Sequence, residues 1–225
     1  MIQYDRLKPL IHIHIPKTGG TSIRDIYKNW FSQGLLLHYF NGTKQKKPNK
    51  FNLEKLHTLN QPVCVYGHFN HKREFGTRDY YPEVNQFITI LRDPFEKAIS
   101  GYFFLRKQKD LWVDQSNIPK SNLLEYLQNH QGSKSIYNFF PYEVTMQNYK
   151  EIIETKFIEI GILEHLDESM QRIAKKLSFK YDSGSIPLLN TTNRDQRVPY
   201  EIKEEFRENN KLLYAIYEYV LSKYI

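Results

Sequence analysis

The sequence predicts an α/β fold in which a mostly parallel central sheet is flanked by helices on both faces. Three observations lead to this prediction: short apolar runs typical of strands, helical patterns that alternate with them, and proline or glycine at the junctions. Parallel strands place their carboxyl ends at one edge of a sheet, where ligands bind. We therefore expect functional side chains just beyond the strand ends. The predicted strands cover residues 10–15, 63–66, 86–91 and 157–162.

Helical spacing of apolar residues follows the first, third and fourth of these strands. Pro94 lies where a proline favours the first turn of a helix. Residues 34–50 and 71–83 show weaker patterns, so we interpret them as a loop and a surface segment. The predicted helices cover residues 23–30, 53–59, 95–108, 123–127, 167–177 and a C-terminal stretch from Pro199.

The length and charge of the chain limit the possible functions. With 225 residues we interpret positions 1–225 as a single domain. The formal charge of +7 indicates an acidic partner, for which an anionic nucleotide and an acidic glycan serve equally well. The single cysteine, Cys64, leaves no intramolecular disulfide, and no leader or membrane-spanning pattern is evident. We expect a cytoplasmic protein without stable membrane insertion.

The segment HIPKTGGTS, residues 14–22, is typical of a phosphate-binding turn between a strand and a helix. Gly19 and Gly20 allow positive φ and a close approach of the backbone to an anion. Lys17 adds a mobile positive charge. The candidate hydroxyl donors are Thr18, Thr21 and Ser22.

The position of Lys17 separates this turn from a Walker A loop. In Walker A sequences the lysine follows the last glycine, and a serine or threonine beside it holds Mg²⁺. Here the lysine precedes both glycines, and no strand-end carboxylate for Mg²⁺ is evident. An ATP-dependent kinase and a glycine turn without any ligand are therefore the weaker interpretations.

A second candidate phosphate site lies in LRDPFEKAISGYFF. Arg92 comes at a strand end, and Ser100 follows about two helical turns later. A guanidinium fork and a hydroxyl group are suited to a second, separate phosphate. The plain alternative is that Arg92 pairs with a neighbouring carboxylate such as Asp93, while Ser100 lies on the helix surface.

These motifs carry a family resemblance. PKTGGTS resembles the 5′-phosphosulfate loop of sulfotransferases that use 3′-phosphoadenosine 5′-phosphosulfate (PAPS), and the arginine–serine pair resembles their 3′-phosphate site. Together with YGHF, residues 66–69, these motifs look like those of the carbohydrate sulfotransferases, nearest to the heparan sulfate and uronyl 2-O-sulfotransferase branch. The resemblance implies a P-loop-like three-layer fold and metal-free transfer of a sulfuryl group from PAPS to a carbohydrate hydroxyl by in-line displacement.

The resemblance also assigns parts of the chain. Residues 10–31 and 86–108 become the donor-binding elements, and Thr192 and Arg194 belong to a segment that closes over the nucleotide. The weakly patterned residues 111–150 are expected to form an acceptor-side insertion.

Two residues are candidates for the general base. His68 lies just past a strand end, and an imidazole that titrates near neutral pH can accept a hydroxyl proton. Asp25 is the alternative, because other glycan sulfotransferases place a catalytic glutamate eight residues after the loop lysine. Its plain interpretation is an exposed carboxylate in the first turn of a helix, where the helix dipole favours it. Lys17 is expected to neutralise the leaving phosphate as the bond breaks.

The remaining histidines invite a metal interpretation. His12 and His14 share one face of a strand, and His68 and His71 could add ligands. No cysteine or carboxylate cluster accompanies them, so we predict no metal site. A non-catalytic basic module for glycans or nucleic acid is the other alternative. Because no nucleic-acid-binding motif is evident, we expect a hydroxyl-bearing acceptor as the partner, and no nucleic acid.

Overall fold

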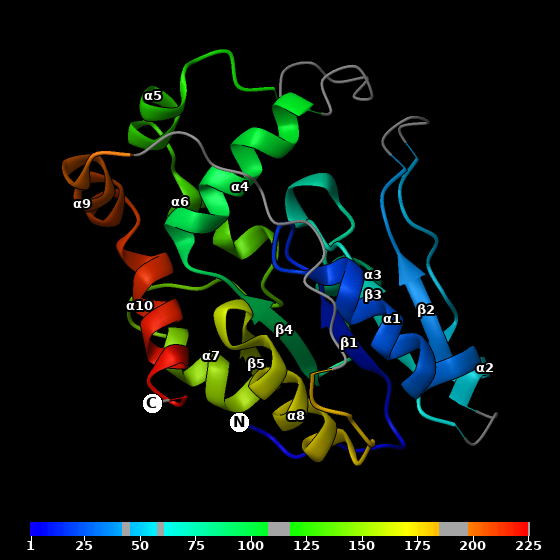
Figure 1. Cartoon of the computed structure of the whole chain (residues 1–225). Helices are drawn as coiled ribbons and strands as arrows, with labels where there is room; N and C mark the ends of the chain where they lie inside the picture. The colour runs from blue at the N-terminus through cyan, green and yellow to red at the C-terminus, as the bar shows by residue number, and fades with distance from the viewer. Residues whose placement is uncertain (42–45, 58–60, 108–117, 185–197, 225) are drawn as a thin grey trace.

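The computed structural model describes residues 1–41, 46–57, 61–107, 118–184 and 198–224, and these form an α/β fold (Figure 1). In the described residues, parallel strands form a five-stranded sheet in the order β2-β3-β1-β4-β5. Helices cover both faces, so the predicted P-loop-like, three-layer α/β architecture is confirmed. The strands are β1 (Leu10–Ile13), β2 (Leu35–His38), β3 (Cys64–Gly67), β4 (Phe87–Leu91) and β5 (Phe157–Ile162).

One face of the sheet is covered by α1 (Gly20–Phe31) and α8 (Leu166–Leu177). Side chains alternate along a strand, so every second strand residue meets these helices. Leu10 of β1 and Ile88 of β4 pack in this layer with Ile23 and Tyr27 of α1. Burial on both faces accounts for the continuous apolar runs that marked these strands in the sequence.

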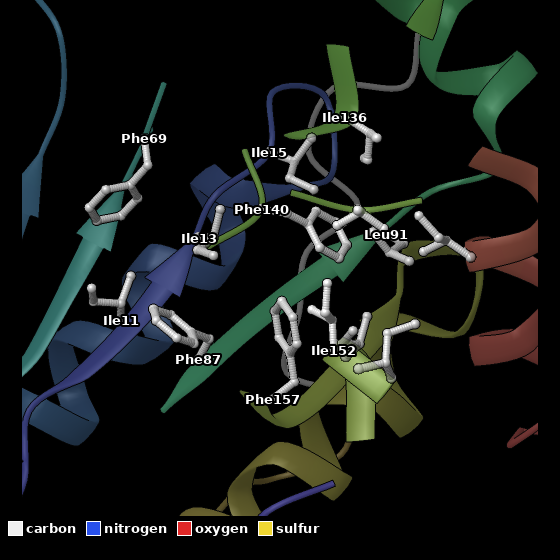
Figure 2. Close-up of a cluster of buried hydrophobic side chains, with 14 of the residues drawn as sticks. Ile11, Ile13, Ile15, Phe69, Phe87, Leu91, Ile136, Phe140, Ile152 and Phe157 are labelled. Atoms are coloured by element: carbon white, nitrogen blue, oxygen red, sulfur yellow. The ribbon is translucent and has the colours of Figure 1, made fainter. Parts of the chain in front are cut away.

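The opposite face carries a larger apolar cluster, part of which Figure 2 shows in close-up. Ile11 and Ile13 of β1 and Phe87 of β4 point into it, and Phe157 of β5 meets Phe140 with ring centroids 5.4 Å apart. The cover comes from α2 (Leu53–His57), α7 (Tyr149–Lys156), α10 (Lys211–Leu221) and the chain around Phe140.

A third apolar cluster forms away from the sheet, among α4 (Pro94–Lys107), α5 (Leu123–Gln128) and α9 (Tyr200–Asn209). Figure 1 shows these helices gathered beyond the arrowhead of β4. Phe206 of α9 is fully buried against Phe95 of α4, with ring centroids 5.3 Å apart. The cluster fixes α4, and α4 carries Ser100 toward the edge where the strands end.

Three sequence predictions need correction. Residues 35–38 form the edge strand β2, although the region was predicted to be a loop. Leu37 of β2 is 42% exposed, because an edge strand is only half covered.

The predicted C-terminal helix is in fact two helices, α9 and α10, which are separated at Asn210. The side-chain amide of Asn210 donates to the carbonyls of Phe206 and His130.

The segment predicted to be a surface excursion, residues 71–83, is partly core. It contains a 3-10 turn (His71–Arg73) and the short helix α3 (Thr77–Tyr80). Phe75, Thr77 and Tyr81 are each at most 2% exposed. A helix of four residues gives no readable period, which is why the sequence pattern did not reveal it.

The remaining described elements are short. They are the 3-10 turns Ser32–Gly34, Ile136–Asn138 and Leu163–His165 and the helix α6 (Gly132–Ser135). Within the described ranges, no helix combines the length and apolarity needed to cross a membrane.

Candidate functional site

The carboxyl ends of β1, β3 and β4 meet at one edge of the sheet. β1 is the middle strand and pairs in parallel with both neighbours, so the segments that follow the three strands leave in the same direction. Lys17 follows β1, His68 follows β3 and Arg92 follows β4. Three polar groups from distant parts of the chain therefore share this edge.

The β1–α1 loop, residues 14–19, turns sharply into α1. Lys17 and Gly19 both have positive φ, 71° and 81°, and α1 begins at Gly20. The hydroxyl of Thr18 donates to the carbonyl of Ile15 at 2.8 Å, so this buried side chain holds the shape of the loop. The amides of the first helical turn have no acceptor within the helix. Loop and helix start together offer an anion site.

Both glycines are required by the packing around them. A Cβ on Gly19 would come within 2.7 Å of Leu163 Cδ1, in addition to the strain of its positive φ. A Cβ on Gly20 would lie only 1.9 Å from His14 Nε2, because the imidazole ring of His14 lies directly on the helix start. Of the two hydroxyl residues that follow, Thr21 is exposed and Ser22 is buried.

The ammonium group of Lys17 lies over an aromatic ring of α4. Its Nζ is 4.3 Å from the centroid of the Phe104 ring, which is 37% exposed. Burial, with a contribution from the nearby positive charge of Arg92, lowers the pKa of Lys17 from its ordinary value. The lysine is thus held by a π face near a second cation, an arrangement that favours the approach of an anion.

Arg92 joins β4 to the loop. Its Nη1 donates to the carbonyl of Lys17 at 3.4 Å, and its Nη2 lies 3.8 Å from Glu96 Oε2. Ser100 lies two turns along α4 and is 3% exposed. Arg92 therefore pairs with a nearby carboxylate, as in the plain alternative, and this carboxylate is Glu96.

A small cavity of about 30 Å³ lies beside Arg92 and Thr18. Lys97 of α4 also lines it, with its Nζ 5.8 Å from the centroid of the Phe139 ring. Burial lowers the pKa of Lys97 to about 8, and no ion pair joins it to a carboxylate of the described residues. Two cationic side chains therefore border this cavity.

His68 is held in one tautomer by the backbone. Its Nδ1 lies 2.7 Å from the carbonyl oxygen of His14. A carbonyl only accepts, so Nδ1 carries the proton and Nε2 keeps its lone pair. Burial lowers the pKa of His68, while the bond to the His14 carbonyl partly opposes this effect. A neutral imidazole with a basic Nε2 is the form that a general base requires.

Aromatic side chains surround His68. The ring of His14 stacks on it with centroids 4.4 Å apart, and the ring of Tyr39 meets it edge-on at 4.9 Å. Tyr39 also places its hydroxyl 3.2 Å from His14 Nδ1. Tyr66, two residues before His68, donates its hydroxyl to the carbonyl of Gly20 at 2.8 Å. These rings connect the ends of β1, β2 and β3 with the start of α1.

The other two histidines of the metal interpretation, His12 and His71, make structural contacts. His12 is 1% exposed between Tyr27 and Tyr66, and burial lowers its pKa to about 3. His71 places Nε2 3.1 Å from the carbonyl oxygen of Phe140. In the described part of the chain, no group of histidine, cysteine and carboxylate side chains could hold a metal ion.

Asp25 lies on the exposed side of α1. Its carboxylate accepts from Lys28 Nζ at 2.7 Å, and this bond lowers its pKa. It stands in the second turn of α1 and not in the first. Thr192 and Arg194 lie outside the described residues.

Several residues of this edge escaped the sequence reasoning. Tyr39 follows β2, so it was missed together with that strand. Phe104 and Lys97 lie on the helix of Ser100 at helical spacing, which is a signal that the sequence did contain. His14 was considered only as a metal ligand, because nothing local shows that its carbonyl reaches His68.

Comparison with known proteins gives the following result. The family described as "Sulfotransferase family" matches residues 2–219 of this chain. No curated protein matches it.

Two similar solved structures are also sulfotransferases. Mouse SULT7A1, solved as a complex with PAP, is 14% identical, with 91% of this chain and 65% of that chain covered and a TM-score of 0.49. The sulfotransferase from Alicyclobacillus acidocaldarius is 13% identical, with 93% and 96% covered and a TM-score of 0.48. The chain thus spans about two thirds of the mouse protein and nearly all of the bacterial one.

Proposed function

The chain belongs to the sulfotransferase family, and on that premise we propose that it moves a sulfuryl group from PAPS to a hydroxyl group of a carbohydrate. The observation that carries the proposal is the shared sheet edge of Lys17, Arg92 and His68. An anion site, a second cation and a proton acceptor are what in-line transfer from an anionic donor needs.

The donor would be held by the β1–α1 loop and α4. In the proposal, the first amides of α1 and the Lys17 ammonium bind the 5′-phosphosulfate, with Thr18, Gly19, Gly20, Thr21 and Ser22 forming the cradle. Arg92 and Ser100 bind the 3′-phosphate. The chemistry of this donor set fits an anion, because it consists of amides, hydroxyls and cations. Bound PAPS supplies an activated sulfuryl group with a phosphate leaving group.

Two side chains would act on the reacting atoms. His68 takes the proton of the acceptor hydroxyl at Nε2, since Nδ1 is occupied by the His14 carbonyl. Lys17 neutralises the charge that develops on the leaving phosphate, and the Phe104 ring beneath its ammonium positions it for this role. The proposed chemistry uses no metal, so we expect full activity in the presence of EDTA.

The acceptor is proposed from the sequence motifs. LRDPFEKAISGYFF and YGHF favour the heparan sulfate and uronyl 2-O-sulfotransferase branch, and a carbohydrate acceptor, as an acidic glycan, would suit the formal charge of +7. We also propose that residues 1–225 act as one domain, with residues 111–150 on the acceptor side. Ile136, from the described part of that segment, lines the cavity beside Arg92 and supports this placement.

A thermal-shift experiment tests the donor. At 100 times its dissociation constant a ligand adds about 2.7 kcal/mol of stability, which corresponds to about 5–10 °C for a chain of this size. We expect this shift with PAP and none with ATP and Mg²⁺. The reverse result would favour a kinase. A shift with acidic glycans alone would favour a non-catalytic binding module.

A transfer assay tests the acceptor. The enzyme is incubated with radiolabelled PAPS and a panel of uronic-acid polysaccharides, neutral polysaccharides and small alcohols, with Lys17→Ala as the inactive control. Lys28→Ala is the matched control, because Lys28 is an exposed lysine paired with Asp25 away from the loop. Label transfer to small alcohols alone would contradict the carbohydrate assignment.

A further inference from the structure

His14 touches both halves of the candidate site. Its carbonyl accepts from His68 Nδ1 at 2.7 Å, and its ring stacks on the ring of His68. On the other side, the same ring fills the space where a Cβ of Gly20 would lie, 1.9 Å from His14 Nε2. The imidazole therefore lies between the base and the first residue of α1.

We propose that His14 is a positioning residue, whose ring fixes the orientation of His68 relative to the start of α1. The catalytic importance of this role rests on the proposed function, whereas the observed packing of His14 does not depend on it. The ring works as a spacer, because its contacts are ring faces and edges. Among the described residues, the polar contact of this ring is with the hydroxyl of Tyr39, 3.2 Å from Nδ1.

The surroundings keep His14 uncharged. Burial and the neighbouring groups His68, His12, Arg24 and Lys17 lower its pKa to about 2. It therefore does not titrate in the range where His68 would. The titratable rings that meet His14 in the described residues are Tyr39 and Tyr66. Burial raises the pKa of Tyr39 to about 12, with Arg24 opposing the effect, and burial also raises the pKa of Tyr66. Changes in the titration of His68 thus report on its exposure to water.

Two substitutions separate the ring from its polar atoms. His14→Phe keeps an aromatic ring on His68, whereas His14→Ala opens that face to water. We expect His14→Ala to raise the pKa of His68 toward the ordinary value, since the burial that lowers it is lost. His14→Phe should leave that pKa unchanged. Tyr39→Phe is the control, because it removes the hydroxyl contact and keeps both rings.

Histidine side-chain NMR of the enzyme without donor gives the direct measurement. The expected result is an Nδ1–H tautomer of His68 in all variants and a raised pKa only in His14→Ala. An unchanged pKa in His14→Ala would overturn the proposal. This readout needs neither PAP nor an acceptor, so a failure to bind PAP would count against the proposed function and leave the inference about His14 intact.

A double-mutant cycle tests the second contact. Gly20→Ala should clash with the His14 ring and weaken PAP binding roughly tenfold or more, since either the ring or the helix start must shift. In the His14→Ala background the clash is gone, so the same substitution should cost less than about threefold. Equal costs in both backgrounds would contradict the spacer role. The four proteins are compared by calorimetric titration with PAP, after circular dichroism has shown that each is folded.

Discussion

The two halves of the candidate site are built in different ways. The anion half is a continuous stretch, in which the β1–α1 loop and the start of α1 supply backbone amides and Lys17. The base half has no local motif, because His68 depends on the His14 carbonyl just after β1 and on the Tyr39 ring just after β2. A continuous half can be recognised from sequence, whereas an assembled half depends on strand order.

The largest expected effect tests the base half. His68→Ala should lower kcat by about 10²–10⁴, the usual contribution of a positioned general base, while the affinity for PAP stays within about threefold of wild type. Rate assays at saturating PAPS and calorimetry measure the two. His165→Ala is a matched control, since this exposed histidine lies after β5 in a 3-10 turn. Retention of most activity by His68→Ala would transfer the role of base to Asp25.

Several buried histidines should make the stability of the folded protein sensitive to acid. Burial lowers the pKa of His12 to about 3, of His14 to about 2 and of His38 to about 4. Below about pH 6.5 the unfolded chain binds these protons and the folded chain does not, so stability falls as the pH falls. Burial likewise lowers the pKa of His130 to about 4. Four such groups give a loss of up to about 5 kcal/mol per pH unit well below pH 6.

Urea unfolding at pH 7.5, 6.0 and 5.5 measures this dependence. Removing one titrating group with His12→Phe should reduce the slope by about one quarter. An identical slope in this variant would show that His12 is not a source of the acid sensitivity.

Arg92 tests whether the anion half holds two phosphates. Arg92→Lys keeps the charge and loses the planar fork, so PAP affinity should fall about tenfold. Adenosine 5′-monophosphate lacks the 3′-phosphate, and its affinity should change less than about twofold. Equal losses for both ligands would place Arg92 at the loop alone, consistent with its bond to the Lys17 carbonyl.

The smallest effect concerns the contact between Lys17 and α4. Phe104→Leu removes the π face under the ammonium, and a cation–π contact at an exposed site contributes about 0.5–1 kcal/mol. We expect kcat to fall about two- to fivefold, because the ammonium group is held less firmly. Phe103→Leu is the control on the same helix, because the Phe103 ring packs on Tyr102. Equal effects of both substitutions would assign the loss to α4 packing.

Much of the sheet could be predicted, because β1, β3, β4 and β5 are buried on both faces and read as continuous apolar runs. β2 could not, since it lies at the edge with Leu37 exposed. Because β2 was not predicted, Tyr39, which directly follows it, was not recognised as a residue of the candidate site.

Within the candidate site, residue types were easier to predict than contacts. The order of Lys17 and the glycines is a local property, and it pointed to the family that residues 2–219 match. The stacking of His14 on His68 joins residues that follow two different strands, β1 and β3, and spacing along the chain cannot predict it. For the same reason His12 and His14 looked equivalent in the sequence, although His12 lies within β1 and His14 lies beyond its end.

The partner of His68 Nδ1 bears on how the base would be reset after each turnover. That partner is a neutral carbonyl, and no carboxylate of the described residues forms an ion pair with His68. An imidazolium formed there would gain no stabilisation from an adjacent negative charge. It would therefore lose its proton to solvent readily once the product departs, so that recycling of the base would not limit the rate.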